Sequence, residues 1–71
     1  MELKEARKNA RYRQQDVADH LGVSRQTYSR MEQHPEAVSV GDARKLAEFF
    51  GVTVDDIFFE SDYKETYSRA T

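Results

Sequence analysis

The sequence predicts an all-α fold, a compact bundle of five short helices. Three observations lead to this prediction. The chain has 71 residues, which leaves room for one hydrophobic core and no second globular domain. Apolar residues recur at helical spacing in successive short segments that turn-forming residues separate. No segment shows the strict alternation typical of a strand, so the apolar faces of these helices must pack against one another.

The first two helices are expected in the N-terminal third of the chain. The segment 2–9 places Leu3 and Ala6 on one face, with charged side chains on the other. The second helix is expected to begin at Gln14 and to end at Gly22, because glycine adopts the left-handed conformation that often terminates a helix. A short turn should join these two helices.

The third helix is expected directly after Ser24, a favourable N-cap residue, and should continue to about Glu32. Pro35 and its neighbours then interrupt the helical pattern. Because only Gly22 and Val23 separate the second helix from Ser24, these two helices should cross at a steep angle.

Two more helices are expected in the C-terminal half. Ser39 is an N-cap for a helix whose apolar stripe closes at Gly51. Thr53 and Asp56 have the spacing of a capping box, which predicts a last short helix through Phe58. The domain is therefore expected to span residues 1–59, and residues 60–71 form a polar C-terminal tail.

Charge is distributed unevenly along the chain, although the net charge is only -2. Residues 1–30 carry seven basic and four acidic side chains, a balance of +3, and residues 31–71 carry four basic and nine acidic ones, a balance of -5. The N-terminal half could therefore meet a polyanion while the acidic remainder faces away from it.

Several classes of function are excluded by composition. The chain has no cysteine and only two histidines, so we expect no disulfide, no metal site and no cofactor. No apolar run approaches the roughly 18 residues of a membrane span, which predicts a soluble cytoplasmic protein. No cluster of catalytic residue types and no large pocket are expected, so neither an enzyme nor a receptor for a small molecule is predicted.

The expected third helix has two chemically different faces. Placed at about 100° per residue, its outer face carries only hydrogen-bonding side chains, namely Arg25, Gln26, Ser29 and Arg30. Tyr28 and Met31 fall on the opposite side. Arginine can pair with two acceptors of guanine and glutamine with the N6 and N7 atoms of adenine, so the outer face is suited to reading bases in double-stranded DNA.

At these residues the chain resembles the lambda-repressor-like family of helix-turn-helix regulators, which includes phage Cro and repressor proteins and many bacterial regulators. The resemblance covers roughly residues 3 to 59 and rests on several successive motifs. These motifs are Leu3-Lys4-Glu5-x-Arg7, Gln14, Ala18, Gly22, Val23-Ser24-Arg25-Gln26-Thr27, Glu32, Leu46-Ala47 and Gly51-Val52-Thr53-Val54-Asp55-Asp56-Ile57-Phe58.

The resemblance implies a five-helix domain that binds a palindromic DNA operator as a homodimer and inserts residues 24–32 into the major groove. It also implies an internal ion pair between Arg7 and Glu32. The residues expected to contact DNA are Arg13, Gln14, Gln15, Ser24, Arg25, Gln26, Thr27, Ser29 and Arg30. The predicted function is a sequence-specific transcriptional regulator, most simply a repressor of phage or bacterial type.

The sequence departs from the family pattern at several positions. Arg11 stands where the family usually has glycine, and Arg13 stands where it usually has a Ser or Thr cap. Tyr28 replaces an aliphatic core residue, so its hydroxyl needs water or a polar partner. The segment 33–37 lacks the Gly-Lys or Gly-Arg pair that often contacts the phosphate backbone.

Two alternatives stay open at this point. The acidic net charge and the acidic loop at Glu36 would also suit a protein-interaction module of the same fold, such as an antitoxin or an anti-repressor. Phe49, Phe58 and Phe59 are many large apolar groups for one small core. They are expected either in a dimer surface or beneath the C-terminal tail.

Overall fold

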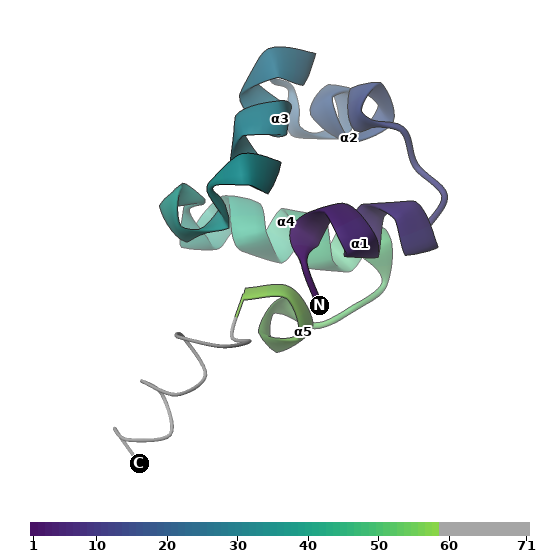
Figure 1. Cartoon of the computed structure of the whole chain (residues 1–71), viewed down its shortest axis with the longest axis vertical. Helices are drawn as coiled ribbons and strands as arrows, with labels where there is room; N and C mark the ends of the chain where they lie inside the picture. Colours follow the sequence, from purple (N-terminus) through teal and green to yellow (C-terminus); the bar gives the residue numbers. More distant parts are fainter. Residues whose placement is uncertain (59–71) are drawn as a thin grey trace.

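The computed structural model describes residues 1–58, which form five α-helices and one short 3-10 helix (Figure 1). The elements in order are α1 (Leu3–Asn9), α2 (Gln14–Leu21), α3 (Arg25–Gln33), η1 (Pro35–Ala37), α4 (Val40–Phe50) and α5 (Val54–Phe58). The all-α, five-helix prediction is confirmed. The proposed tail, residues 60–71, and Phe59 lie outside the described residues.

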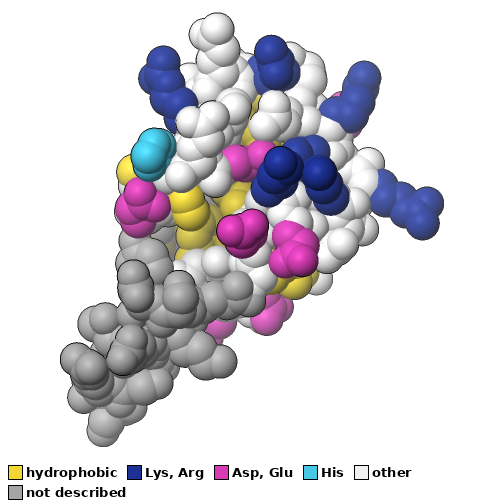
Figure 2. Space-filling model, in the orientation of Figure 1, with side chains coloured by type: hydrophobic (Ala, Val, Ile, Leu, Met, Phe, Trp, Pro, Cys, Tyr) yellow, Lys and Arg dark blue, Asp and Glu magenta, His cyan; other side chains and the backbone are white. Residues whose placement is uncertain are grey.

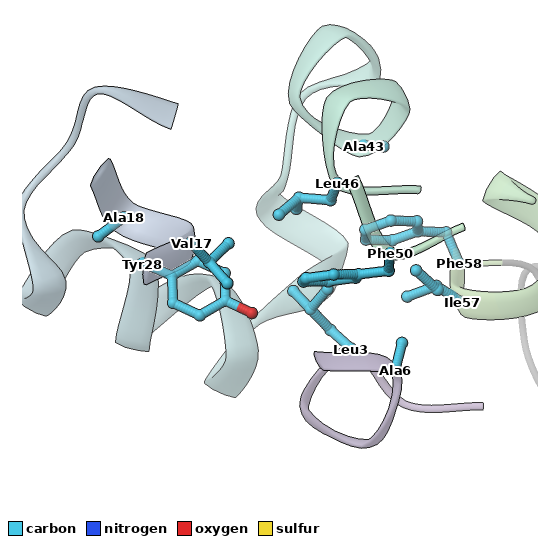
Figure 3. Close-up of a cluster of buried hydrophobic side chains, with 10 residues drawn as sticks. All are labelled: Leu3, Ala6, Val17, Ala18, Tyr28, Ala43, Leu46, Phe50, Ile57 and Phe58. Carbon is cyan, nitrogen blue, oxygen red and sulfur yellow. The ribbon is translucent and has the colours of Figure 1, made fainter. Parts of the chain in front are cut away.

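The helices pack around a small core that α4 crosses (Figure 1). In that view α2 and α3 lie above α4, α1 lies in front of it, and α5 lies below. All five α-helices contribute to the cluster of buried side chains (Figure 3). Its members are Leu3, Ala6, Val17, Ala18, Tyr28, Ala43, Leu46, Phe50, Ile57 and Phe58. The predicted apolar stripes are thus the surfaces by which the helices pack.

The helix starts follow the predicted caps. The hydroxyl oxygen of Ser24 accepts a hydrogen bond of 3.1 Å from the backbone N–H of Thr27, and Ser39 caps α4 in the same way. Thr53 and Asp56 each accept a hydrogen bond of 3.1 Å from the backbone N–H of the other. These bonds satisfy N–H groups that have no partner within the helix, which is why the helices begin at these positions.

Within residues 1–58, three residues adopt the left-handed backbone conformation. Gly22 and Gly51 end α2 and α4 with φ of 74° and 73°, as the sequence predicted. The third is Arg11, with φ of 65°, in the turn between α1 and α2. An arginine in this conformation has a Cβ that crowds the backbone, so the turn is strained where a glycine would not be.

Phe49 and Phe58 both find partners within the described part of the fold. The ring of Phe49 stacks on Tyr12, with centroids 4.3 Å apart, and on His20, with centroids 3.9 Å apart. Phe58 is buried beside Ile57 in the core. The partners of these two rings thus lie within residues 1–58, and a dimer surface at either ring stays a prediction. No helix within residues 1–58 has the length and apolarity needed to cross a membrane.

Candidate nucleic-acid interface

The α2 and α3 helices and the turn between them form a helix-turn-helix unit. Gly22 allows the chain to reverse direction, and the backbone N–H of Val23 bonds the carbonyl of Ala18 at 3.0 Å. Ser24 then starts α3 one residue later. Because α2 and α3 pack on each other, the turn holds the N-terminal end of α3 in a fixed place on the surface.

The outer face of α3 is a shallow polar hollow. Its lining residues come from successive turns of one helix face, namely Arg25, Gln26, Ser29, Arg30 and Gln33. On the opposite face Tyr28 is fully buried, and its ring lies beside Val17 (Figure 3). The sequence therefore predicted correctly which side of α3 faces outward.

Gln33 is a member of this face that sequence analysis missed. Its side-chain amide donates a 3.5 Å hydrogen bond to the hydroxyl of Ser29, one turn earlier. At about 100° per residue, Gln33 falls between Ser29 and Gln26 on the helix surface. The spacing could have identified it, but the expected helix ended one residue too early, at Glu32.

The electrostatics of α3 favour an anion on its outer side. The only acidic residue of the helix is Glu32, and its side chain is 5% exposed and paired with Arg7 in the interior. Arg25 and Arg30 are exposed and have no carboxylate partner within the described residues. In Figure 2 most Lys and Arg side chains lie in the upper part of the molecule, and most Asp and Glu side chains lie below.

The Arg7–Glu32 ion pair joins α1 to the end of α3, as the resemblance implied. Arg7 Nε lies 2.5 Å from Glu32 Oε2, and Arg7 Nη1 donates a 2.9 Å hydrogen bond to the carbonyl of Tyr12. Burial alone would raise the pKa of Glu32, but the hydrogen bonds it accepts, first from Arg7, outweigh burial and lower its pKa. The carboxylate is therefore held in its charged form inside the fold.

Gln14 links this buried pair to the outer face. Its side-chain Nε2 donates a 3.0 Å hydrogen bond to Glu32 Oε1, and its Oε1 accepts a 3.4 Å hydrogen bond from Arg25 Nη1. The structure thus brings together two of the predicted DNA-binding residues, one from the start of α2 and one from the start of α3.

Ser24 and Thr27 serve the start of α3. Besides capping the helix, the Ser24 hydroxyl donates a 3.0 Å hydrogen bond to Thr27 Oγ1. Both hydroxyls are therefore engaged with each other. Their structural role is to cap the start of α3. Contact of either side chain with DNA stays a prediction.

Arg13, directly before α2, and Gln15, within it, bond acidic residues of α2. Arg13 Nη2 lies 3.0 Å from Asp16 Oδ1, and Gln15 Nε2 donates a 2.8 Å hydrogen bond to Asp19. The hydrogen bonds from the Arg13 side chain and backbone lower the pKa of Asp16. Arginine has no acceptor atom, so Arg13 cannot accept from the first turn of α2 as a Ser or Thr cap does. Contact of either residue with DNA stays a prediction.

The Tyr28 hydroxyl is buried and has no hydrogen-bond partner within the described residues. Burial, followed by the nearby carboxylate of Glu32, raises the pKa of Tyr28, so the hydroxyl stays neutral. The carboxylate of Glu32 and the guanidinium of Arg7 lie close enough to this hydroxyl to influence its pKa. Residues 1–58 also contain no group of three or more His, Cys, Asp or Glu side chains arranged to hold a metal ion.

Comparisons with known proteins agree with this geometry. The model of the helix-turn-helix family matches residues 3–57, which include all five α-helices except the last residue of α5. An HTH-type transcriptional regulator of Methanocaldococcus jannaschii, itself described as uncharacterized, is 47% identical over 49 residues, covering 69% of this chain and 74% of its own length. No solved structure matches the chain.

The family match spans most of the chain and coincides with the observed α2–turn–α3 unit. The relative from Methanocaldococcus jannaschii is named as a regulator of this helix-turn-helix type. The α3 helix within this match has a polar outer face and a buried Tyr28 on its inner face. This chain therefore belongs to the helix-turn-helix family, in its lambda-repressor-like, Cro and repressor type.

Proposed function

We propose that this protein is a sequence-specific DNA-binding transcriptional regulator, and that it acts as a repressor by inserting α3 into the major groove. The observation that carries the proposal is the outer face of α3, where Arg25, Gln26 and Arg30 are exposed without a competing carboxylate. Family membership and the relative named as a transcriptional regulator support the same function.

Each residue of this face has a chemical role in the proposal. Arg25 and Gln26 lie in the first turn of α3, the part of a recognition helix that reaches base edges. Arg25 is assigned to the O6 and N7 acceptors of a guanine and Gln26 to the N7 and N6 groups of an adenine. Ser29, Arg30 and Gln33 lie one and two turns later, where the groove walls bring phosphates within reach.

The proposed regulator binds its operator as a homodimer. Two copies related by a twofold axis would place two α3 helices in successive major grooves, with half-sites about 34 Å apart. The operator is then a palindrome with one turn of DNA between half-site centres. A protein held in the groove excludes other proteins from the same DNA, which is the simplest mechanism of repression. Sedimentation of the free protein and of its DNA complex tests the stoichiometry.

Selection of binding sites from random duplex DNA tests the proposal directly. The wild-type chain is expected to enrich one motif. Arg25→Ala should relax the preference at one base pair, at a cost of about 1 to 3 kcal/mol for the preferred base. Arg44→Ala removes an exposed arginine from α4, away from the hollow on α3, and serves as the matched control. If no motif is enriched, the protein does not read DNA sequence.

A second candidate function is a protein-interaction module with this fold. It is favoured by a shallow apolar groove beside α4 and α5, where Val40 is 71% exposed. The groove is lined by Pro35, Val38, Val40, Ala43, Arg44, Val54 and Phe58. Salt separates the two functions, because affinity for DNA should fall by orders of magnitude from low to moderate salt. Binding through an apolar groove should change little over that range.

A further inference from the structure

We infer that Glu32, whose side chain faces the interior, is a positioning residue that aims the Arg25 side chain through Gln14. The inference rests on the proposed function, in which Arg25 reads a base. According to the inference, Glu32 helps to determine which base is preferred although its side chain does not touch DNA.

The inference starts from three consecutive hydrogen bonds. Glu32 is held by Arg7 at 2.5 Å, Gln14 donates to Glu32 at 3.0 Å, and Arg25 donates to Gln14 at 3.4 Å. The first bond is buried, since the side chains of Arg7 and Glu32 are 10% and 5% exposed. The last bond reaches the exposed surface. An anchored carboxylate in the core is thus connected to a base-reading group on the outside.

The chemistry of the three groups gives the Gln14 amide a single favourable orientation. A carboxylate only accepts hydrogen bonds and a guanidinium only donates them. The amide must therefore turn its NH₂ group to Glu32 and its oxygen to Arg25. If the amide were flipped, its oxygen would face the carboxylate and its NH₂ group would face the guanidinium, and both contacts would be repulsive. The charge on Glu32 therefore determines which atom Gln14 presents to Arg25.

A comparison within the same helix shows what this connection adds. Arg30 lies on the same face of α3 as Arg25, and within residues 1–58 its side chain has no hydrogen-bond partner. An unheld arginine must lose its rotamer freedom when it binds, whereas a side chain already held in position loses less. Glu32 and Gln14 should therefore affect the preference for a base at the base pair that Arg25 reads. They should not affect the contacts that Arg30 makes.

The first test removes the link and leaves the buried ion pair in place. Gln14→Met has a similar shape and no hydrogen-bonding amide. Asn9→Leu is the matched control, because it removes an exposed side-chain amide from α1 at a residue that is not among the predicted DNA contacts. Arg25→Ala identifies the base pair that Arg25 reads in selected DNA. At that base pair, Gln14→Met should lower the preference for the best base about tenfold. Asn9→Leu should leave this preference unchanged, and any affinity that this control loses should be lost uniformly across sequences.

The second test addresses Glu32 itself. A single Glu32→Gln substitution would leave the buried Arg7 without its counter-ion. Both members of the pair are therefore replaced, by Arg7→Met together with Glu32→Leu. Proteins often tolerate the replacement of a buried ion pair by apolar side chains of similar volume. Circular dichroism confirms that this double variant is folded. If Glu32 positions Arg25, the folded double variant loses the same tenfold preference at the same base pair. If Glu32 is only structural, the preference stays at its wild-type value, and the inference is overturned.

A third measurement needs no DNA. The NMR signal of the Arg25 Nε–H group in the free protein should shift in Gln14→Met and in the double variant, and stay in place in Asn9→Leu. An unchanged signal in both would overturn the inference while leaving the proposed function intact. Failure of the wild-type chain to select any motif would overturn the proposed function and the inference with it, so the two failures can be told apart.

Discussion

Arg7 on α1 and Glu32 on α3 form a buried ion pair, with Nε and Oε2 2.5 Å apart. The pair joins the first helix to the end of the helix that carries the proposed reading face. Because Tyr28 anchors the same helix through the core, α3 is held at two points along its inner face. Its rotation, and with it the direction of the outer side chains, is therefore fixed by the interior of the protein.

Removing one member of this pair should destabilise the fold strongly. Glu32→Ala leaves the guanidinium of Arg7 buried without its counter-ion, a change that typically costs about 3 to 5 kcal/mol. A domain of this size is only marginally stable, so the variant should lose a large part of its free energy of unfolding. Urea denaturation followed by circular dichroism measures the loss. A free energy of unfolding within about 1 kcal/mol of wild type would contradict a stabilising ion pair.

Acid should unfold the protein partly through Glu32. The pKa of Glu32 is lowered in the folded state, so the folded protein keeps this group charged to lower pH than the unfolded chain does. The stability that it contributes is therefore present above the ordinary glutamate pKa of about 4.3 and is lost as pH falls through the lower folded value. Asp16 and Asp56, whose pKa values are also lowered, act in the same direction.

The pH dependence is measured as the thermal midpoint between pH 7 and pH 3. The midpoint should fall below about pH 4.3 in the wild type. In Glu32→Gln the starting midpoint should be lower and its further fall with acid smaller, since one titrating group is gone. A wild-type midpoint that does not change down to pH 3 would refute the assigned role of the carboxylates.

Tyr28→Phe should not destabilise the protein. The hydroxyl is buried without a partner in the described residues, and such a group carries a desolvation cost of about 1 to 3 kcal/mol. Phenylalanine keeps the ring in the core and removes that cost, so the free energy of unfolding should rise by about 1 kcal/mol. Tyr12→Phe, at the half-buried ring stacked on Phe49, is the control and should change stability less. A loss of stability in Tyr28→Phe would show that the hydroxyl is bonded in solution.

Local patterns predicted the helices because their causes are local. Ser24 and Ser39 cap the residues that follow them, and Gly22 ends α2 in the conformation that glycine favours. The inward face of α3 follows from its helical periodicity in the same way. The outer hollow was therefore predictable, apart from Gln33, which lies beyond the expected end of the helix.

Contacts between distant elements could not be predicted from patterns of this kind. The bonds from Gln14 to Glu32 and to Arg25 depend on how α2 and α3 pack, and no spacing within one helix encodes them. The stacking of Phe49 on Tyr12 and His20 likewise joins three separate segments. The Arg7–Glu32 pair was expected mainly because the chain resembles a known family.

Most substitutions lower the free energy of unfolding, but the strained turn at Arg11 predicts one that raises it. Arg11 has φ of 65°, where a non-glycine residue costs about 1 to 3 kcal/mol. Arg11→Gly relieves that strain but increases the freedom of the unfolded chain, so the expected net gain in the free energy of unfolding is about 1 kcal/mol.

Gly22→Ala is the matched control, because Gly22 has φ of 74° and nothing lies within 4 Å of the position of an added Cβ. That variant should lose about 1 kcal/mol through backbone strain alone. Urea denaturation of both variants measures the two effects, and a loss of stability in Arg11→Gly would show that the arginine side chain stabilises the turn by more than its backbone strains it.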